Sequence, residues 1–293
     1  YSQPQHLVIQ SKTPLDDRAG LSVCIDTWGG KGEKVLRPYW LLMTKTYRRN
    51  LQYRVAHLVD TVGSSIFGYI NIYIWMAAAG PIGKVGNYSV QQLVLWAAFG
   101  QVMYNAVRWT IGLNIQLAVR SGDVSLELLR PIDFFGYVIS RQAGDHLYGL
   151  LYRAAPLYLL YAITIGYRIP PLPSLLLLIP SFALAAYVGL CLGYLEGISS
   201  FWTTDIRWIS YFNMVFLTAA SGVQVPVDIL PGVLGRVLPF APWATLVHYP
   251  NRIYLGLQGW DALLVPAVWA VLLTLICRGL TTLARRHLEV QGG

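Results

Sequence analysis

The chain has little charge and few cysteines for its length. Only 12% of its 293 residues are charged and 55% are hydrophobic, whereas roughly 25% are charged in an ordinary soluble domain. A soluble domain of this size needs more polar residues to cover its core, so the composition argues against one. The apolar surplus predicts a multi-pass membrane protein. The ten Trp and nineteen Tyr agree with this, because both residues favour the membrane–water interface.

The motifs of several enzyme classes are also absent from the sequence. The three cysteines have no CxxC spacing and suggest no disulfide framework, and neither HExxH nor GxSxG occurs. An ATPase of the phosphate-loop type needs GxxxxGK[ST]. The nearest stretch, GGKG at residues 29–32, fails because Lys31 is followed by Gly32. We therefore expect no catalytic residue, no metal site and no cofactor in this chain.

The chain has a net charge of +8. Its basic residues lie between apolar segments and are not gathered on one soluble face. Basic residues in such places set membrane topology and contact anionic lipid. The expected partner is therefore membrane lipid, and nucleic acid is not expected.

Six apolar segments approach the ~20 residues that a helix needs to cross a bilayer. They occupy residues 55–80, 89–113, 146–167, 174–197, 207–224 and 261–277. With six spans both termini lie on one side, and eighteen of the 22 Lys and Arg residues fall on that side. The positive-inside rule then makes both termini and residues 114–145 cytoplasmic. The predicted fold is an all-α membrane protein with six transmembrane helices.

The residues before the first span have the pattern of an amphipathic helix, over residues 35–54. Apolar and aromatic side chains recur on one face, and the other face is basic. The apolar face has Leu36, Tyr39, Trp40, Met43 and Tyr47. The basic face has Arg37, Lys45, Arg48 and Arg49. Such a helix lies in the membrane interface; the alternative is a soluble surface helix. We expect polar tails at residues 1–34 and 288–293.

Residues 224–258, between the fifth and sixth predicted spans, hold five of the sixteen prolines. Proline lacks a backbone donor and breaks helices. We expect short, broken helices here, at the outer surface.

Three charged residues, Asp60, Arg153 and Glu196, fall within predicted spans. A charge at the centre of a span costs ~2.5–3.5 kcal/mol on insertion scales, so each of them needs an explanation. In one interpretation they pair with one another or with lipid headgroups. In the other they line a translocation path, together with Ser64.

The stretch SGDVSLELLRPID, residues 121–133, has four charged side chains between long apolar runs. In the predicted topology it is cytoplasmic, where a short polar helix suits docking onto a soluble partner. Pro131 would end this helix, because proline disfavours helical geometry in the residue before it. The alternative is an ordinary loop helix without a partner.

In these features the sequence resembles the permease subunits of type-2 ATP-binding-cassette exporters, especially a bacterial group of drug or viologen exporters. Those permeases have an interfacial helix before span one and a Pro-rich broken segment between spans five and six. They also have the sequence G-[DE]-x-x-x-x-L-L-R-P before span three. This motif is matched by Gly122, Asp123, Leu128, Leu129, Arg130 and Pro131. The likeness covers residues 35–287, the expected permease domain.

The resemblance implies a membrane-spanning permease that forms the translocation path of an ATP-driven exporter in the bacterial cytoplasmic (inner) membrane. It would pair with a second identical or paralogous permease and with two copies of a separate ATPase, which would bind ATP and Mg. Residues 122–131 would be the coupling helix. Asp123, Glu127 and Arg130 would contact the rim of the ATPase groove. The leucines would divide between that groove and the underside of the bundle: Leu126, Leu128 and Leu129.

Two rival functions are open on the residues alone. A membrane-embedded enzyme acting on lipid or lipid-linked substrate would gather acids or histidine at one membrane face. The available residues are Asp60, Glu196, Asp205 and His146. The other rival is a non-transporting structural subunit of a membrane complex.

Overall fold

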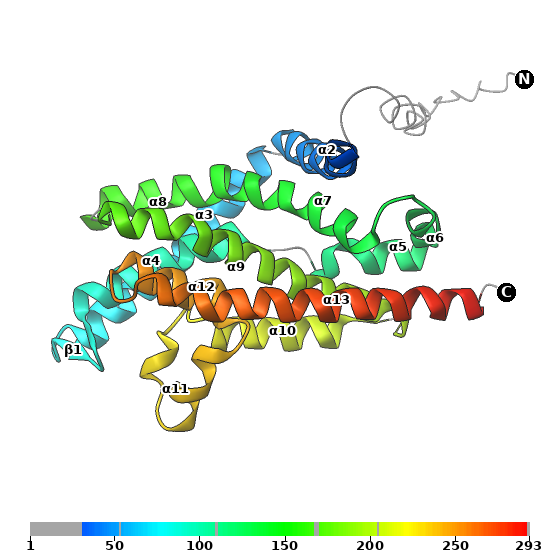
Figure 1. The fold of residues 1–293 in the computed structure, drawn as a ribbon. Coiled ribbons are helices and arrows are strands. Elements are labelled where there is room, and N and C mark those ends of the chain that lie inside the picture. Colours follow the sequence, from blue (N-terminus) through cyan, green and yellow to red (C-terminus); the bar gives the residue numbers. More distant parts are fainter. Residues whose placement is uncertain (1–30, 53, 109–110, 167–169, 204, 292–293) are drawn as a thin grey trace, which may run out of the picture.

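Long helices packed side by side form the body of the protein (Figure 1). The computed structural model describes residues 31–52, 54–108, 111–166, 170–203 and 205–291. A small hairpin joins two antiparallel strands, β1 (Lys84–Val85) and β2 (Tyr88–Ser89), which the sequence did not predict. The helical elements of the described part otherwise agree with an all-α membrane protein.

Four helical stretches of the described part are long and apolar enough to cross a membrane. They are His57–Ala79, Phe134–Gly166, Leu172–Phe201 and Trp260–His287. The first lies within α3 (Arg54–Ala79), the third contains α9 (Leu172–Ile198), and the fourth contains most of α13 (Leu264–Gln291). The second runs through α7 (Phe134–Gly149), the π-helical turn η2 (Leu150–Ala154), α8 (Ala155–Tyr161) and the π-helical turn η3 (Ala162–Gly166).

The other two predicted spans correspond to shorter helices. The predicted second span is α4 (Val90–Val107), with 18 residues, and the predicted fifth span is α10 (Arg207–Ala220), with 14. At 1.5 Å per residue α10 is about 21 Å long, which is less than the ~30 Å thickness of a bilayer core. The count of six spans therefore stays a prediction.

Most of the residues of α4 are buried. Its first turn is closed by a capping box: the Ser89 hydroxyl accepts from the backbone N–H of Gln92 at 3.3 Å, and the Gln92 side chain accepts from the N–H of Ser89 at 2.9 Å. Further along, the buried Trp96 indole donates to the carbonyl oxygen of Gly222 at 2.7 Å. The polar capping residues therefore fix where α4 begins, and its apolar side chains bury it among the other helices.

Two predicted boundaries shift because the helices continue past the apolar runs. α7 begins at Phe134, twelve residues before the predicted start of the third span, and Asp133 caps it by accepting from the N–H of Gly136 at 2.8 Å. α13 continues to Gln291 and takes in part of the expected C-terminal tail. A helix satisfies its own backbone hydrogen bonds, so it passes from lipid to headgroups and water without a break.

The predicted amphipathic segment corresponds to α2 (Lys31–Leu51), which begins within the expected N-terminal tail. The rest of that tail, residues 1–30, lies outside the described residues. α2 lies outside the bundle against α7 and crosses the direction of the long helices (Figure 1).

The Pro-rich region consists of short helices. They are η5 (Val227–Ile229), α11 (Val233–Val237), η6 (Leu238–Phe240) and α12 (Ala244–Tyr254). α11 protrudes from the side of the bundle (Figure 1), whereas α12 is buried against α4 and α9. The carboxylate of Asp228 accepts from the Tyr88 hydroxyl at 2.8 Å and from the Arg252 guanidinium at 2.7 Å. It thereby ties this region to the hairpin.

Candidate functional site

The predicted coupling segment lies at the end of the bundle that the C-terminal end of α13 also reaches (Figure 1). It follows α5 (Ile115–Ser121) and consists of α6 (Asp123–Leu128) and a bend at residues 129–131. Gly122 separates the two helices with a φ of 80°, a left-handed conformation that glycine adopts readily. The helix ends before Arg130 and Pro131, as the proline predicts.

The leucines of this segment face two ways. Leu126 and Leu129 are 57% and 81% exposed. Leu128 is half-buried and packs against the main core, and Val124, which the sequence analysis did not select, is buried within it. The segment is therefore fixed to the bundle on one side and presents two leucines on the other.

Two of the three charged residues of this segment also face outward. Asp123 and Arg130 are exposed, whereas the side chain of Glu127 is turned inward. The carboxylate of Glu127 accepts from the Tyr137 hydroxyl at 3.1 Å and lies 3.6 Å from the Arg141 guanidinium. Glu127 therefore attaches α6 to α7, whereas the side chains of Asp123 and Arg130 are exposed.

The backbone before α5 makes a left-handed turn, with φ values of 54°, 50° and 63° at Gly112, Leu113 and Asn114. This conformation costs an L-residue roughly 1–2 kcal/mol. Leu113 and Asn114 are the non-glycine residues of the described part that adopt it. The carbonyl oxygen of the buried Leu113 accepts from Arg141 at 3.0 Å and from Gln142 at 3.3 Å. Contacts with α7 thus hold a strained turn in place.

The opposite side of this turn touches α9. A Cβ atom at Gly197 would lie 2.2 Å from the carbonyl oxygen of Gly112, so that the two backbones are in direct contact. The turn is therefore held between α7 and α9, at the point where the chain passes from α4 to the coupling segment.

The predicted interfacial helix rests on α7 with one face. The buried residues on that face are polar: Thr46 is buried, and the Asn50 amide donates to the Asp145 carboxylate at 2.8 Å. Tyr39, Met43 and Tyr47 are half-buried, whereas the four basic residues and one tryptophan are exposed: Arg37, Trp40, Lys45, Arg48 and Arg49. Their exposure leaves a basic and aromatic surface outside the bundle.

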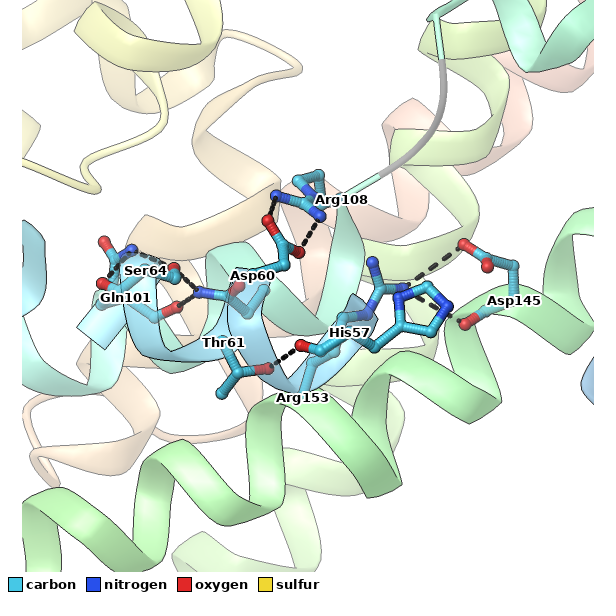
Figure 2. A network of polar contacts seen from close by, with 9 residues as sticks. His57, Asp60, Thr61, Ser64, Gln101, Arg108, Asp145 and Arg153 are labelled. Carbon is cyan, nitrogen blue, oxygen red and sulfur yellow. Dashed lines mark hydrogen bonds and ion pairs between the residues drawn. The ribbon is translucent and has the colours of Figure 1, made fainter. Parts of the chain in front are cut away.

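A polar strip runs along the contact between α3 and α4 (Figure 2). Asp60 forms an ion pair with Arg108, with a second Nη1–Oδ1 distance of 3.3 Å. One turn further along α3, the Ser64 hydroxyl accepts from the Gln101 amide at 2.8 Å and from the Asn105 amide at 2.6 Å. Asp60 and Ser64, two of the four candidate path residues, therefore belong to the same strip.

Arg153 lies near the first turns of α3, beside His57 (Figure 2). It comes from the π-helical turn η2 and is 4% exposed. Its guanidinium lies 3.4 Å from both the backbone carbonyl and the carboxylate of Asp145. Three of the four candidate path residues thus lie in or beside the first half of α3.

Glu196, the fourth candidate, lies between other helices. It is buried in α9 and accepts hydrogen bonds from the Ser210 hydroxyl and, at 3.2 Å, from the Asn213 amide of α10. The amide oxygen of Asn213 accepts in turn from the Trp243 indole at 2.7 Å. Glu196 therefore connects α9 with α10 and with the start of α12.

The residues that a membrane enzyme would need are not brought together. Asp60 and Asp205 each pair with an arginine, and hydrogen bonds from Arg207 hold the pKa of Asp205 at about 2. Glu196 has its partners on α10, and His146 is buried in α7. Among the described residues no group of three His, Cys, Asp or Glu could hold a metal ion.

Several residues of the site were missed from the sequence. Gln101, Asn105 and Arg108 recur at i, i+4 and i+7, so they share one face of a helix, and this spacing was a usable signal. Arg141 offered no such signal, because its contacts come from the left-handed turn and from α6.

The family model for ABC-2 family transporter proteins matches residues 62–292. The match includes residues 122–131 and most of the bundle, and it begins after α2. No curated protein and no solved structure matches the chain. Because the family model covers well over half of the sequence, and because the bundle contains long apolar helices, the chain belongs to the ABC-2 family as a multi-pass membrane permease.

Proposed function

We propose that the chain is the permease subunit of an ATP-driven exporter and that it docks a separate ATPase through residues 122–131. The observation that carries this proposal is the outward-facing pair Leu126 and Leu129, flanked by Asp123 and Arg130. Protein interfaces commonly have an apolar centre and a charged rim. The segment also stands at one end of the bundle, where a soluble partner can reach it (Figure 1).

A docking element can transmit movement only if it is attached to the part that moves. Val124 is buried in the core and Leu128 packs against it. Glu127 adds a hydrogen bond to Tyr137 and an ion pair to Arg141, both on α7. A force on the exposed face of α6 would therefore pass to the long helix that begins at Phe134.

The proposed assembly has two permeases, identical or paralogous, and two ATPase copies that bind ATP and Mg. In each permease six spans cross the bacterial inner membrane, with both termini and the coupling segment in the cytoplasm. This orientation is supported by the distribution of basic residues. We also propose a cargo of the class that drug and viologen exporters carry, because residues 122–131 resemble the motif of those permeases.

We assign the cargo path to the polar strip between α3 and α4. The side chains of Asp60 and Arg108 are 39% and 33% exposed in the single chain. An ion pair open to lipid is costly, and intramembrane charges usually face a bundle interior or a water-filled path. This strip would therefore border the path or the second permease. Glu196 is buried between α9 and α10 and is not included.

Co-purification tests the docking surface. The full chain is isolated in mild detergent, and the ATPase that accompanies it is quantified. Changing Leu126 and Leu129 together to Asp should reduce the bound ATPase at least ten-fold, because it places charge at the centre of the interface. The matched control is Ile82→Asp, which changes an equally exposed aliphatic residue beside the hairpin, at the other end of the bundle (Figure 1). Full retention of the ATPase by the double variant would contradict the assignment.

A further inference from the structure

One side chain, Arg141, connects the coupling segment to the strained turn before it. Its Nη1 atom lies 3.6 Å from the Glu127 carboxylate of α6. Its Nη2 atom donates to the carbonyl oxygen of Leu113 at 3.0 Å. The guanidinium also stands 5.4 Å from the centre of the Tyr137 ring, which supports it from one side. A single planar group therefore contacts α6 and the turn at the same time.

The left-handed turn needs such a contact. Leu113 carries a Cβ atom in a conformation that disfavours one, so the turn persists only where its surroundings hold it. On the α9 side the contact is a close approach of two glycine backbones, Gly112 and Gly197. On the α7 side it consists of two hydrogen bonds to the Leu113 carbonyl, from Arg141 and Gln142. The hydrogen bond from Arg141 is the stronger of the two, because its donor is charged and charge-assisted hydrogen bonds are stronger than neutral ones.

We infer that Arg141 is a positioning residue that holds the left-handed turn in place and releases it when the coupling segment moves. This inference rests on the proposed docking of an ATPase to residues 122–131. When α6 shifts relative to α7, Glu127 draws the guanidinium with it and the Leu113 carbonyl loses its charged donor. The turn then relaxes toward a right-handed or extended conformation, and the angle between α4 and α5 changes.

Arginine suits this role better than lysine does. The guanidinium is planar and presents donors in two directions, whereas an ammonium group is a compact point charge on a flexible stem. The two acceptors of Arg141, on Glu127 and Leu113, are approached through different nitrogens. Loss of the contact with either acceptor therefore changes the position of the guanidinium relative to the other acceptor.

Hydrogen–deuterium exchange of the purified full chain tests the hold on the turn. Arg141→Gln should raise the exchange rate of amides in residues 112–118 by about ten-fold, the effect of losing one charge-assisted hydrogen bond. The matched control is Arg278→Gln, which removes an arginine of α13 that lines a separate pocket. Unchanged exchange at residues 112–118 in Arg141→Gln would overturn the inference.

A rescue experiment separates the proposed role from a general packing role. In the Arg141→Gln background, Leu113→Gly should return the exchange of the turn towards the wild-type rate, because glycine adopts a positive φ without strain. Leu113→Ala is the control, since it also removes the side chain but keeps the Cβ atom. Equal behaviour of the glycine and alanine variants would show that strain in the turn is not what Arg141 opposes.

The third measurement adds the co-purified ATPase and a non-hydrolysable ATP analogue. In the wild-type complex the analogue should increase exchange at residues 112–118, and this increase should be absent from Glu127→Gln chains that are isolated with the ATPase bound. An increase that persists in Glu127→Gln would overturn the link from α6 to the turn. If the wild-type chain binds no ATPase, the proposed function is wrong. The exchange rates of Arg141→Gln in the isolated chain still test whether Arg141 holds the turn in place.

Discussion

A Cβ atom at Gly144 would lie 2.2 Å from the backbone carbonyl oxygen of Met43, so α2 and α7 meet backbone to backbone. Close by, the Asn50 amide donates to the Asp145 carboxylate at 2.8 Å. α7 begins directly after the coupling segment. The predicted interfacial helix therefore rests on the helix that the proposed ATPase would move.

This close approach predicts the effect of adding a methyl group. Gly144→Ala should destabilise the protein by about 1–3 kcal/mol, because the added Cβ forces two backbones apart. The measurement is the melting temperature of the full chain in detergent. Gly279→Ala is the control, since its added Cβ meets no atom within 4 Å beyond the adjacent residues and backbone of its own helix, and it should not lower the melting temperature. Equal melting temperatures for the two variants would argue against a rigid contact between α2 and α7.

The Asp228 carboxylate joins the hairpin, η5 and α12, so its loss should loosen that end of the bundle. Burial and the nearby Asp228 raise the pKa of Tyr88, whose hydroxyl donates to the Asp228 carboxylate. Asp228→Asn should lower the free energy of unfolding by about 1–3 kcal/mol, because the guanidinium of Arg252 loses its charged partner.

Thermal melting in detergent measures this effect as well. Asp205→Asn is the matched control, because it removes a carboxylate from the solvent-exposed pair with Arg207. Exposed pairs contribute little, so the control should show no measurable change. A loss of stability in the control as large as that in Asp228→Asn would refute the ranking of the two pairs.

The ion pair between Asp60 and Arg108 predicts a rescue by charge exchange. Asp60→Arg and Arg108→Asp alone should each reduce the membrane yield and the melting temperature, because each places two like charges beside one another near lipid. The double variant restores opposite charges and should recover at least half of the loss. A double variant no better than the worse single one would mean that the two side chains do not interact in the membrane.

The proposed orientation predicts which positions an impermeant thiol reagent reaches. Cys191 and Cys277 are buried, so a Cys24→Ser chain provides a low background. Added to it, Ser125→Cys in α6 should be labelled only after cells are permeabilised. Asn87→Cys in the hairpin turn should be labelled in intact cells, since both side chains are exposed at opposite ends of the bundle. The reverse pattern would invert the topology and with it the docking proposal.

Local patterns in the sequence were sufficient to predict most of the helical elements, but not the hairpin. Apolar runs indicated the long helices, the prolines of residues 224–258 indicated short broken ones, and the polar stretch at residues 121–133 indicated a separate short helix. Boundaries were less well predicted, as at Phe134, because a helix continues where its side chains become polar. The candidate path residues Asp60, Ser64 and Arg153 could be selected from the sequence because charged and polar residues are conspicuous in apolar runs.

The partners of those residues depended on the tertiary structure. The pairing of Asp60 with Arg108 requires α3 and α4 to pack in one register, and the inward position of Glu127 requires α6 to fold back on α7. Helical periodicity and proline are properties of a few neighbouring residues, so the sequence by itself determined where the chain is helical, apolar or broken. The left-handed conformation of Leu113 is decided by residues of α7 and α9 that surround it, because Leu113 itself favours other backbone angles.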